Sequence, residues 1–148
     1  VYLTVNGEVR VKVEQKRPIA RVASDDVFYI DEGGFRMPLS SQHSARVPLA
    51  YGIVDEADLE TVYKVALTVY KDSFLKTYVT EIHQNENKEI SLKLRLLDFE
   101  VLVGTLDNLE IKLQNLKAFY QKAKKDTMLD VYKSVNLQFD NQVVCTKK

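Results

Sequence analysis

Few residue types that usually mark a chemically active site occur in this chain of 148 residues. Cys145 is the only cysteine, so no internal disulfide and no zinc site built on thiolates can form. The two histidines, His43 and His83, lie in unrelated stretches and have no companion at metal-ligand spacing. The sequence also has no nucleophile elbow and no phosphate-binding glycine loop. We therefore expect no enzyme, no catalytic residues, no metal site and no cofactor.

The chain also has little net charge and no long apolar run. Lys+Arg and Asp+Glu are both 21, which argues against nucleic acid as the main partner because phosphate binding requires a basic excess. No run approaches the roughly 18–20 apolar residues that span a bilayer. The first residue is valine and already belongs to a strand-like pattern. We therefore expect a fragment whose natural N-terminus lies upstream, where a membrane segment would also lie.

The first 14 residues alternate polar and apolar side chains, as half-buried strands do. Asn6-Gly7 is a strong hairpin signal because both residues tolerate positive φ. Pro18 interrupts the alternation, since proline has no backbone N–H for a strand ladder. We place a domain boundary near Arg21, which divides the chain into residues 1–21 and 22–148.

The middle of the chain predicts a second hairpin and a helix. Residues 27–30 and 35–37 read as strands joined by the Gly-rich turn at 31–34. Asp55 is a good N-cap for a helix over 56–71, whose apolar residues recur at helical spacing.

Three more strands and a second helix follow. Alternation predicts strands at 77–82 and 89–96, and a β-branched apolar run predicts another at 99–103. Asp107 is expected to cap the second helix in a capping-box arrangement with Glu110. The expected buried stripe of this helix is Leu109, Leu113, Leu116, Tyr120 and Ala123. Few helices among consecutive strands indicate an α+β fold, with a mostly antiparallel sheet and two main helices packed on one side.

The last hairpin is the part of the sequence most suggestive of binding. We expect strands at 136–139 and 142–146 around a two-residue turn at Asp140-Asn141, which would place Leu137 opposite Val144. One face would then hold Val135, Leu137, Phe139 and Val144, and the other Asn136, Gln138, Val143 and Cys145. A closing strand leaves a sheet edge that can accept a partner strand, although terminal lysines also protect edges from aggregation. From the residues alone, a protected edge and a partner-binding edge are both open.

Three stretches, taken in order, resemble one protein family. They are residues 11–21; residues 29–35 with the follow-up at 47–52; and residues 99–104 with 112–116 and 135–140. Together they resemble the extracytoplasmic part of the bacterial cell-division protein family FtsQ/DivIB, over nearly the whole chain. The family often has Arg-Tyr where this chain has Gln138-Phe139, so contacts made by those side chains do not carry over.

The resemblance implies a non-enzymatic scaffold of the divisome, anchored in the cell inner membrane by one helix absent from this chain and facing the periplasm. Residues 1–21 would be the last strands of a truncated POTRA domain, and residues 22–148 the β domain. The implied partners are FtsB/FtsL-like proteins, which would add a strand to the last strand of the β domain. The implied partner-binding residues are Gln138, Phe139, Gln142, Val143, Val144, Cys145, Thr146 and Lys147. On this model Val144→Pro abolishes binding if the Val144 N–H faces the partner.

An alternative function is a POTRA-type chaperone or transport module that binds secreted or outer-membrane polypeptides. That function would use the upstream sheet. Binding retained after deletion of residues 142–148 would favour it over strand addition at the last strand.

Overall fold

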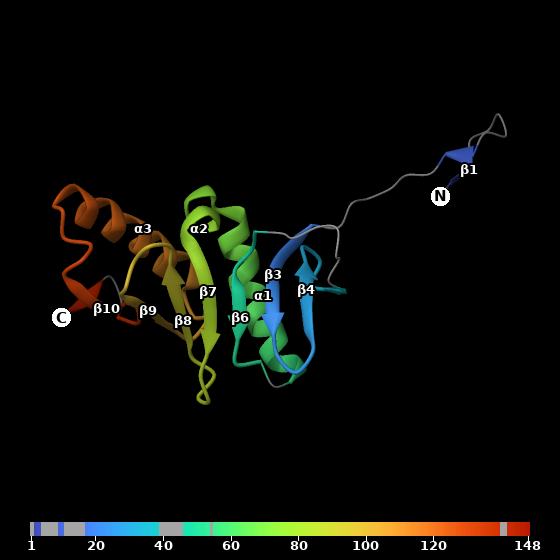
Figure 1. The fold of residues 1–148 in the computed structure, drawn as a ribbon, viewed down its shortest axis with the longest axis horizontal. Coiled ribbons are helices and arrows are strands. Elements are labelled where there is room, and N and C mark those ends of the chain that lie inside the picture. Colours follow the sequence, from blue (N-terminus) through green and yellow to red (C-terminus); the bar gives the residue numbers. More distant parts are fainter. Residues whose placement is uncertain (1, 4–8, 11–16, 39–45, 54, 140–141) are drawn as a thin grey trace.

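One mixed sheet organises the chain in the computed structural model, which describes residues 2–3, 9–10, 17–38, 46–53, 55–139 and 142–148 (Figure 1). Across the sheet the nine strands follow the order β11 (Val144–Lys147), β10 (Tyr132–Asn136), β9 (Glu100–Gly104), β8 (Ile90–Leu94), β7 (Val79–Gln84), β6 (Leu49–Tyr51), β3 (Pro18–Ala23), β4 (Val27–Asp31) and β5 (Arg36–Met37).

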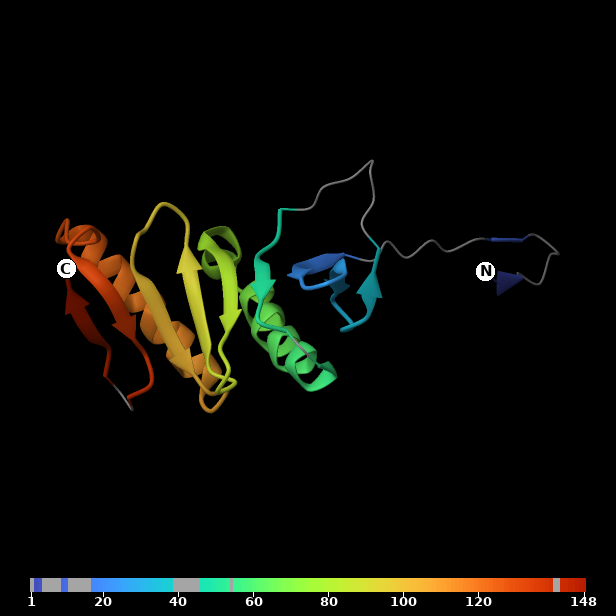
Figure 2. The same ribbon diagram turned by 60° about the horizontal axis from the view of Figure 1, so that its bottom comes forward.

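Five of the eight neighbouring strand pairs in this sheet are antiparallel; the parallel pairs are β3–β6, β6–β7 and β9–β10. The long helices α1 (Glu56–Lys71) and α3 (Leu109–Lys125) lie on the same face of the sheet (Figure 2). The short helix α2 (Ser73–Tyr78) directly follows α1. The predicted α+β fold with a mostly antiparallel sheet is confirmed.

Helix α1 begins and ends where its sequence predicts. The Asp55 carboxylate accepts from the Asp58 N–H at 2.9 Å, and Asp58 Oδ2 accepts from the Asp55 N–H at 3.2 Å. This reciprocal pair satisfies two backbone donors that a helix start leaves free. The buried stripe of α1 includes Leu59, Val62 and Val69 and faces the sheet.

Two predictions about the other helices are wrong. Thr77 and Tyr78 end α2, and the strand predicted to start there begins at Val79. Helix α3 is capped by Asn108 in a left-handed conformation, with φ 56° and no side-chain cap bond, so the predicted Asp107 capping box does not form. The predicted α3 stripe is confirmed, because Leu109, Leu113, Leu116, Tyr120 and Ala123 are all buried.

The N-terminal strands form a small sheet of their own. β1 (Tyr2–Leu3) pairs antiparallel with β2 (Val9–Arg10), which confirms a first hairpin, while the predicted Asn6-Gly7 turn lies outside the described residues. The predicted domain boundary near Arg21 falls inside β3, which pairs with β4 and β6 of the main sheet. The origin of residues 1–21 in a POTRA domain stays a prediction.

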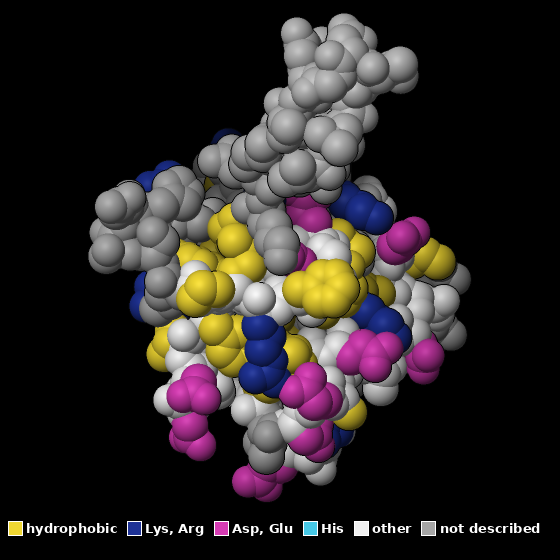
Figure 3. Space-filling model, turned by 90° about the vertical axis from the view of Figure 1, so that its right-hand side faces the viewer, with side chains coloured by type: hydrophobic (Ala, Val, Ile, Leu, Met, Phe, Trp, Pro, Cys, Tyr) yellow, Lys and Arg dark blue, Asp and Glu magenta, His cyan; other side chains and the backbone are white. Residues whose placement is uncertain are grey.

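The two edges of the main sheet differ. β5 is only two residues long and is followed by Pro38, which cannot donate to a neighbouring strand. Viewed from this end, hydrophobic side chains gather across the middle of the face with charged side chains among and below them (Figure 3), and Phe35 and Val27 are 68% and 44% exposed. β11 is four residues long and contains no proline. The β11 edge is therefore the better template for strand addition.

Candidate functional site

The candidate site is the outer edge of β11. Among the described residues this strand pairs with β10 alone, in an antiparallel ladder that places Val135 opposite Cys145 and Asn136 opposite Val144. β10 in turn lies parallel to β9, where Val135 faces Val101. The edge is therefore attached to the core through a buried neighbour, since Val135 is fully buried.

The predicted register of this hairpin is wrong by one residue. A two-residue turn would place Leu137 opposite Val144, but Asn136 occupies that position. β10 ends at Asn136 and β11 begins at Val144, so seven residues of sequence separate the two strands, more than a two-residue turn needs. Leu137 does not pair with β11. Its N–H donates instead to Leu102 O of β9 at 2.9 Å. Residues 140–141, the predicted turn, lie outside the described part of the chain.

The shift exchanges the faces of the last strand, as any one-residue slip must. Val143 and Cys145 are half-buried and pack against the core, on the side of Val135. Val144 is 40% exposed and lies on the opposite side, with Asn136. The prediction that Val144 shares the core face, and that Val143 and Cys145 share the other, is therefore wrong.

The backbone groups of β10 can be assigned to its two neighbours. The Leu137 N–H points to β9, and successive residues of a strand direct their backbone groups to opposite sides. Asn136 therefore directs its N–H and C=O to β11, where it faces Val144. Asn136 and Val144 form a hydrogen-bonded pair of the antiparallel ladder.

The same alternation identifies the free groups of the edge. Val144 directs its N–H to β10, and the bond from the Lys148 N–H to Val131 O at 3.0 Å continues the pattern. Cys145 and Lys147 consequently point their N–H and C=O groups away from β10, to the open edge. The edge thus offers two donor and acceptor pairs to an incoming strand.

The eight predicted partner-binding residues fall into three places along this hairpin. Four form β11 itself, namely Val144, Cys145, Thr146 and Lys147. Gln138 and Phe139 follow β10, and Phe139 is 51% exposed. Gln142 and Val143 precede β11, and the Gln142 N–H lies 3.4 Å from Phe139 O. The hairpin therefore brings all eight close together, although their side chains face different ways.

Two exposed apolar residues beside this hairpin were missed in the sequence. Ile111 of α3 is 56% exposed, and Val131, just before β10, is 37% exposed. Ile111 falls outside the predicted buried stripe of its helix. An apolar residue off the buried stripe is the feature of the sequence that could have indicated its exposure.

The thiol of Cys145 is not set up as a nucleophile. Burial raises the pKa of Cys145, so the thiol stays protonated at neutral pH. No group of three or more His, Cys, Asp or Glu residues suited to a metal occurs among the described residues. His83 Nε2 lies 2.9 Å from Glu81 Oε1, and the His83 ring stacks on Tyr51. His43 is outside the described part of the chain.

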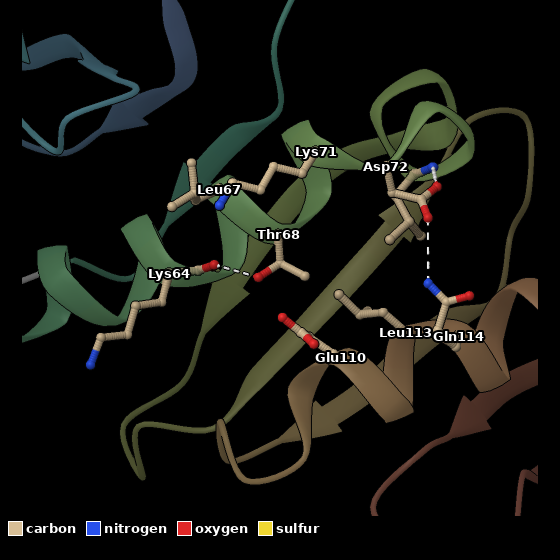
Figure 4. Close-up of a pocket in the computed structure, with 9 residues that line it drawn as sticks. Lys64, Leu67, Thr68, Lys71, Asp72, Glu110, Leu113 and Gln114 are labelled. Carbon is tan, nitrogen blue, oxygen red and sulfur yellow. Dashed lines mark hydrogen bonds between the residues drawn. The ribbon is translucent and has the colours of Figure 1, made fainter.

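A hollow outside this edge strand is a groove between α1 and α3 (Figure 4). Its volume is about 430 Å³, and Leu67, Leu75 and Leu113 lie among lysines and carboxylates on its walls. Asp72 accepts from the N–H groups of Phe74 and Leu75 and pairs with Lys117 at 3.2 Å.

The charge of Asp72 is accounted for by this structural role. Desolvation alone would raise the pKa of Asp72, but the hydrogen bonds from Leu75, Lys117 and Phe74 outweigh it and lower the pKa. The carboxylate is thus ionised and engaged as the cap of α2. The groove has no nucleophile paired with a base among its described residues.

The fold and the edge define an α+β domain whose sheet ends, on one side, in a strand free to pair with another chain. The model of the FtsQ/DivIB, C-terminal related family matches residues 17–146, so the chain belongs to this family. Membership indicates a role in bacterial cell division and in interactions among division proteins. No curated protein matches the chain. Each helix in the described part of the chain is too short or too polar to cross a membrane.

Proposed function

We propose that this chain is the extracytoplasmic part of a non-enzymatic divisome scaffold that binds an FtsB/FtsL-like partner by strand addition to β11. The observation that carries the proposal is the outer side of β11, which pairs with no other described strand, in a chain whose family works in cell division. Strand addition uses main-chain hydrogen bonds for affinity and side-chain pockets for specificity. The mechanism therefore tolerates the family departure at Gln138 and Phe139.

The outward groups of Cys145 and Lys147 would form the main-chain bonds to the partner. The partner strand would also lie beside the outward side chains of Val144 and Thr146. An edge of four residues gives a modest interface of about 800 Å² per partner or less, so a few anchor residues would carry most of the affinity.

The proposal includes a membrane anchor upstream of this chain. The full-length protein would be held in the cytoplasmic membrane by a single helix, with residues 1–21 ending a POTRA domain. The described helices do not supply this anchor. Family members are anchored in this way, with the folded part outside the cytoplasm.

The test is a titration of isotope-labelled protein with the soluble segment of the FtsB-type protein from the same organism, followed by backbone NMR. We expect shift changes concentrated on residues 138–147, with slowed amide exchange at Cys145 and Lys147. Changes confined to residues 1–21, or no changes at saturating partner, would contradict strand addition at β11. Deletion of residues 142–148 provides the matched control, because it removes the edge strand and should abolish the response.

A further inference from the structure

The groove between α1 and α3 is an elongated furrow. Its wall on α1 runs from Lys64 to Lys71, which is about 10 Å at the usual rise per helical residue. The first two turns of α3 supply the opposite wall, from Glu110 to Gln114 (Figure 4). The furrow therefore matches about two turns of a third helix, whose apolar residues recur at i, i+3 or i+4, and i+7.

The floor of this groove is apolar and continuous with the core. Leu75 and Leu113 are each 1% exposed, and Leu113 extends from α3 into the groove (Figure 4). Leu67 of α1 packs against the core but is only half-buried. An occupant with apolar side chains would therefore bury Leu67 the most, and burial of apolar surface stabilises a complex.

The walls of the groove favour a helical occupant over an extended one. Both walls are helices, whose backbone groups are bonded largely within the helix itself. An extended segment in the groove would leave its own N–H and C=O groups without partners on an apolar floor, which is costly. A helix satisfies its own backbone and needs only side-chain contacts. The groove thus differs from β11, where the edge offers backbone groups.

The two walls carry uncommitted charges of opposite sign. Lys71 on α1 and Glu110 on α3 are exposed, and neither has an ion-pair or hydrogen-bond partner among the described residues. Thr68 and Asp72, by contrast, are engaged within the protein. The Thr68 hydroxyl donates to Lys64 O at 2.9 Å, and the Asp72 carboxylate caps α2. An acidic flank beside α1 and a basic flank beside α3 would complement these walls.

We propose that the groove between α1 and α3 binds an amphipathic helix of a partner protein. The apolar stripe of that helix packs on Leu67 and Leu113, its acidic flank lies beside Lys71, and its basic flank lies beside Glu110. The site is separate from the edge strand, because α3 lies between the groove and β11 (Figure 2). The inference does not rest on strand addition, and both surfaces can be occupied at once.

The first test uses a synthetic peptide to compare two apolar residues of the protein. The peptide has about 18 residues, enough to form a helix, with a leucine stripe, glutamate along one flank and lysine along the other. Leu67→Ser should weaken its binding about ten-fold or more, as loss of a central anchor does. Leu96→Ser is the control, because Leu96 is 94% exposed in the turn after β8, and its affinity should stay within about two-fold. Fluorescence anisotropy of the labelled peptide measures affinity, and the amide NMR spectrum reports whether each variant is folded.

The second test changes a charge, and its outcome does not depend on the direction in which the peptide runs. A second peptide has the same leucines and lysine on both flanks. Lys71→Glu should shift the ratio of the two affinities toward the all-lysine peptide about three-fold or more, because it places a carboxylate on each wall. Lys124→Glu makes the same charge change about 20 Å along α3 from Glu110, so its ratio should stay within about two-fold of the unchanged protein.

Amide shift changes in the unchanged protein locate the bound peptide. Changes on residues 64–71 and 110–114 would support the proposal. Absence of binding by the mixed-charge peptide, shift changes at β11 in place of the groove, or the same affinity ratio in Lys71→Glu as in the unchanged protein would each overturn it. Strand addition at β11 would still stand in that case, because the titration with the FtsB-type segment tests it separately.

Discussion

Cys145 lies directly opposite Val135 in the last hairpin, with its side chain against the core and its backbone N–H directed to the open edge. This relationship separates two substitutions that otherwise look equivalent. Proline at position 145 removes a donor that a partner strand would use. Proline at position 144 removes a donor that holds β11 to β10.

We therefore expect Cys145→Pro to weaken partner binding about ten-fold or more while the β10–β11 pairing survives. Cys145→Ala keeps the N–H and should bind within about two-fold of the unchanged protein, which makes it the matched control. Calorimetric titration measures both affinities. Equal affinity of the proline and alanine variants would contradict a role for the outward N–H.

Val144→Pro should act on the protein itself. The substitution breaks the ladder between β11 and β10, so we expect loss of amide protection at Thr146 and Lys148, whose N–H groups face β10, and binding lost as a consequence. Hydrogen exchange of the free protein measures this. Retained protection of β11 in Val144→Pro would show that the backbone alternation is assigned to the wrong side.

An ion pair between buried Asp58 and half-exposed Lys88 connects α1 to the turn after β7. Asp58 is 1% exposed, and its carboxylate accepts from Lys88 Nζ at 2.6 Å as well as from the Asp55 N–H. We expect Asp58→Ala to lower the free energy of unfolding by about 2 kcal/mol or more, because it removes the capping box and leaves a donor unpaired. Glu60→Ala, which removes an exposed partner of Lys64, should cost less than about 1 kcal/mol. Urea unfolding measures the free energy of unfolding of both variants. Equal losses for Asp58→Ala and Glu60→Ala would contradict the structural role of Asp58.

Gly52 allows two strands to approach closely. It has φ +85°, and a Cβ at this position would lie 1.9 Å from Gln84 O. Gly52→Ala should therefore cost roughly 3 kcal/mol or more through strain and backbone displacement. Gly33→Ala is the control, since the nearest atom to a Cβ there belongs to the movable Phe35 ring at 3.1 Å. Thermal unfolding measures the melting temperature of both variants. Equal melting temperatures for Gly52→Ala and Gly33→Ala would contradict the close approach at Gly52.

The carboxylate of Asp72 predicts part of the acid sensitivity. Its pKa is lower in the folded protein than the ordinary value of 3.8, so its contribution to stability is present above that value and is lost as the pH falls through the folded pKa. Asp72→Asn should therefore be less stable than the unchanged protein at pH 7, with the difference shrinking below about pH 4. The free energy of unfolding of both proteins, measured from pH 7 to below pH 4, tests whether the stability difference shrinks as the pH falls. A difference that is constant with pH would show that the carboxylate charge contributes nothing.

The sequence contained enough information for the elements whose signals are local. Asp55 and Asp58 cap α1 with their own side chains, and the apolar stripe of α3 repeats at helical spacing. Helix α2 was missed because six residues give little periodicity, and Thr77-Tyr78-Val79-Thr80 is rich in residues that favour strands. The order of the strands could not be read, since pairs such as β3–β6 join residues far apart in the chain.

The last strand was correctly predicted to be a sheet edge, but its register was not, and its role in partner binding stays a prediction. The edge position of β11 follows from the order of the strands in the sheet. Which side chains of β11 face the core depends on how many residues separate β10 from β11. Leu137 bonds to Leu102 of β9 and so leaves the hairpin one residue earlier than a tight turn requires. Such competition between a local turn signal and a distant strand has no signature in the sequence.

The edge strand follows every other strand of the sheet in chain order. During synthesis, β10 presents its own unpaired side until β11 emerges and covers it. A partner that met the domain before that moment would face a strand with a different set of side chains and a different register. The surface proposed to accept a partner is therefore complete only once the last strand has paired with β10.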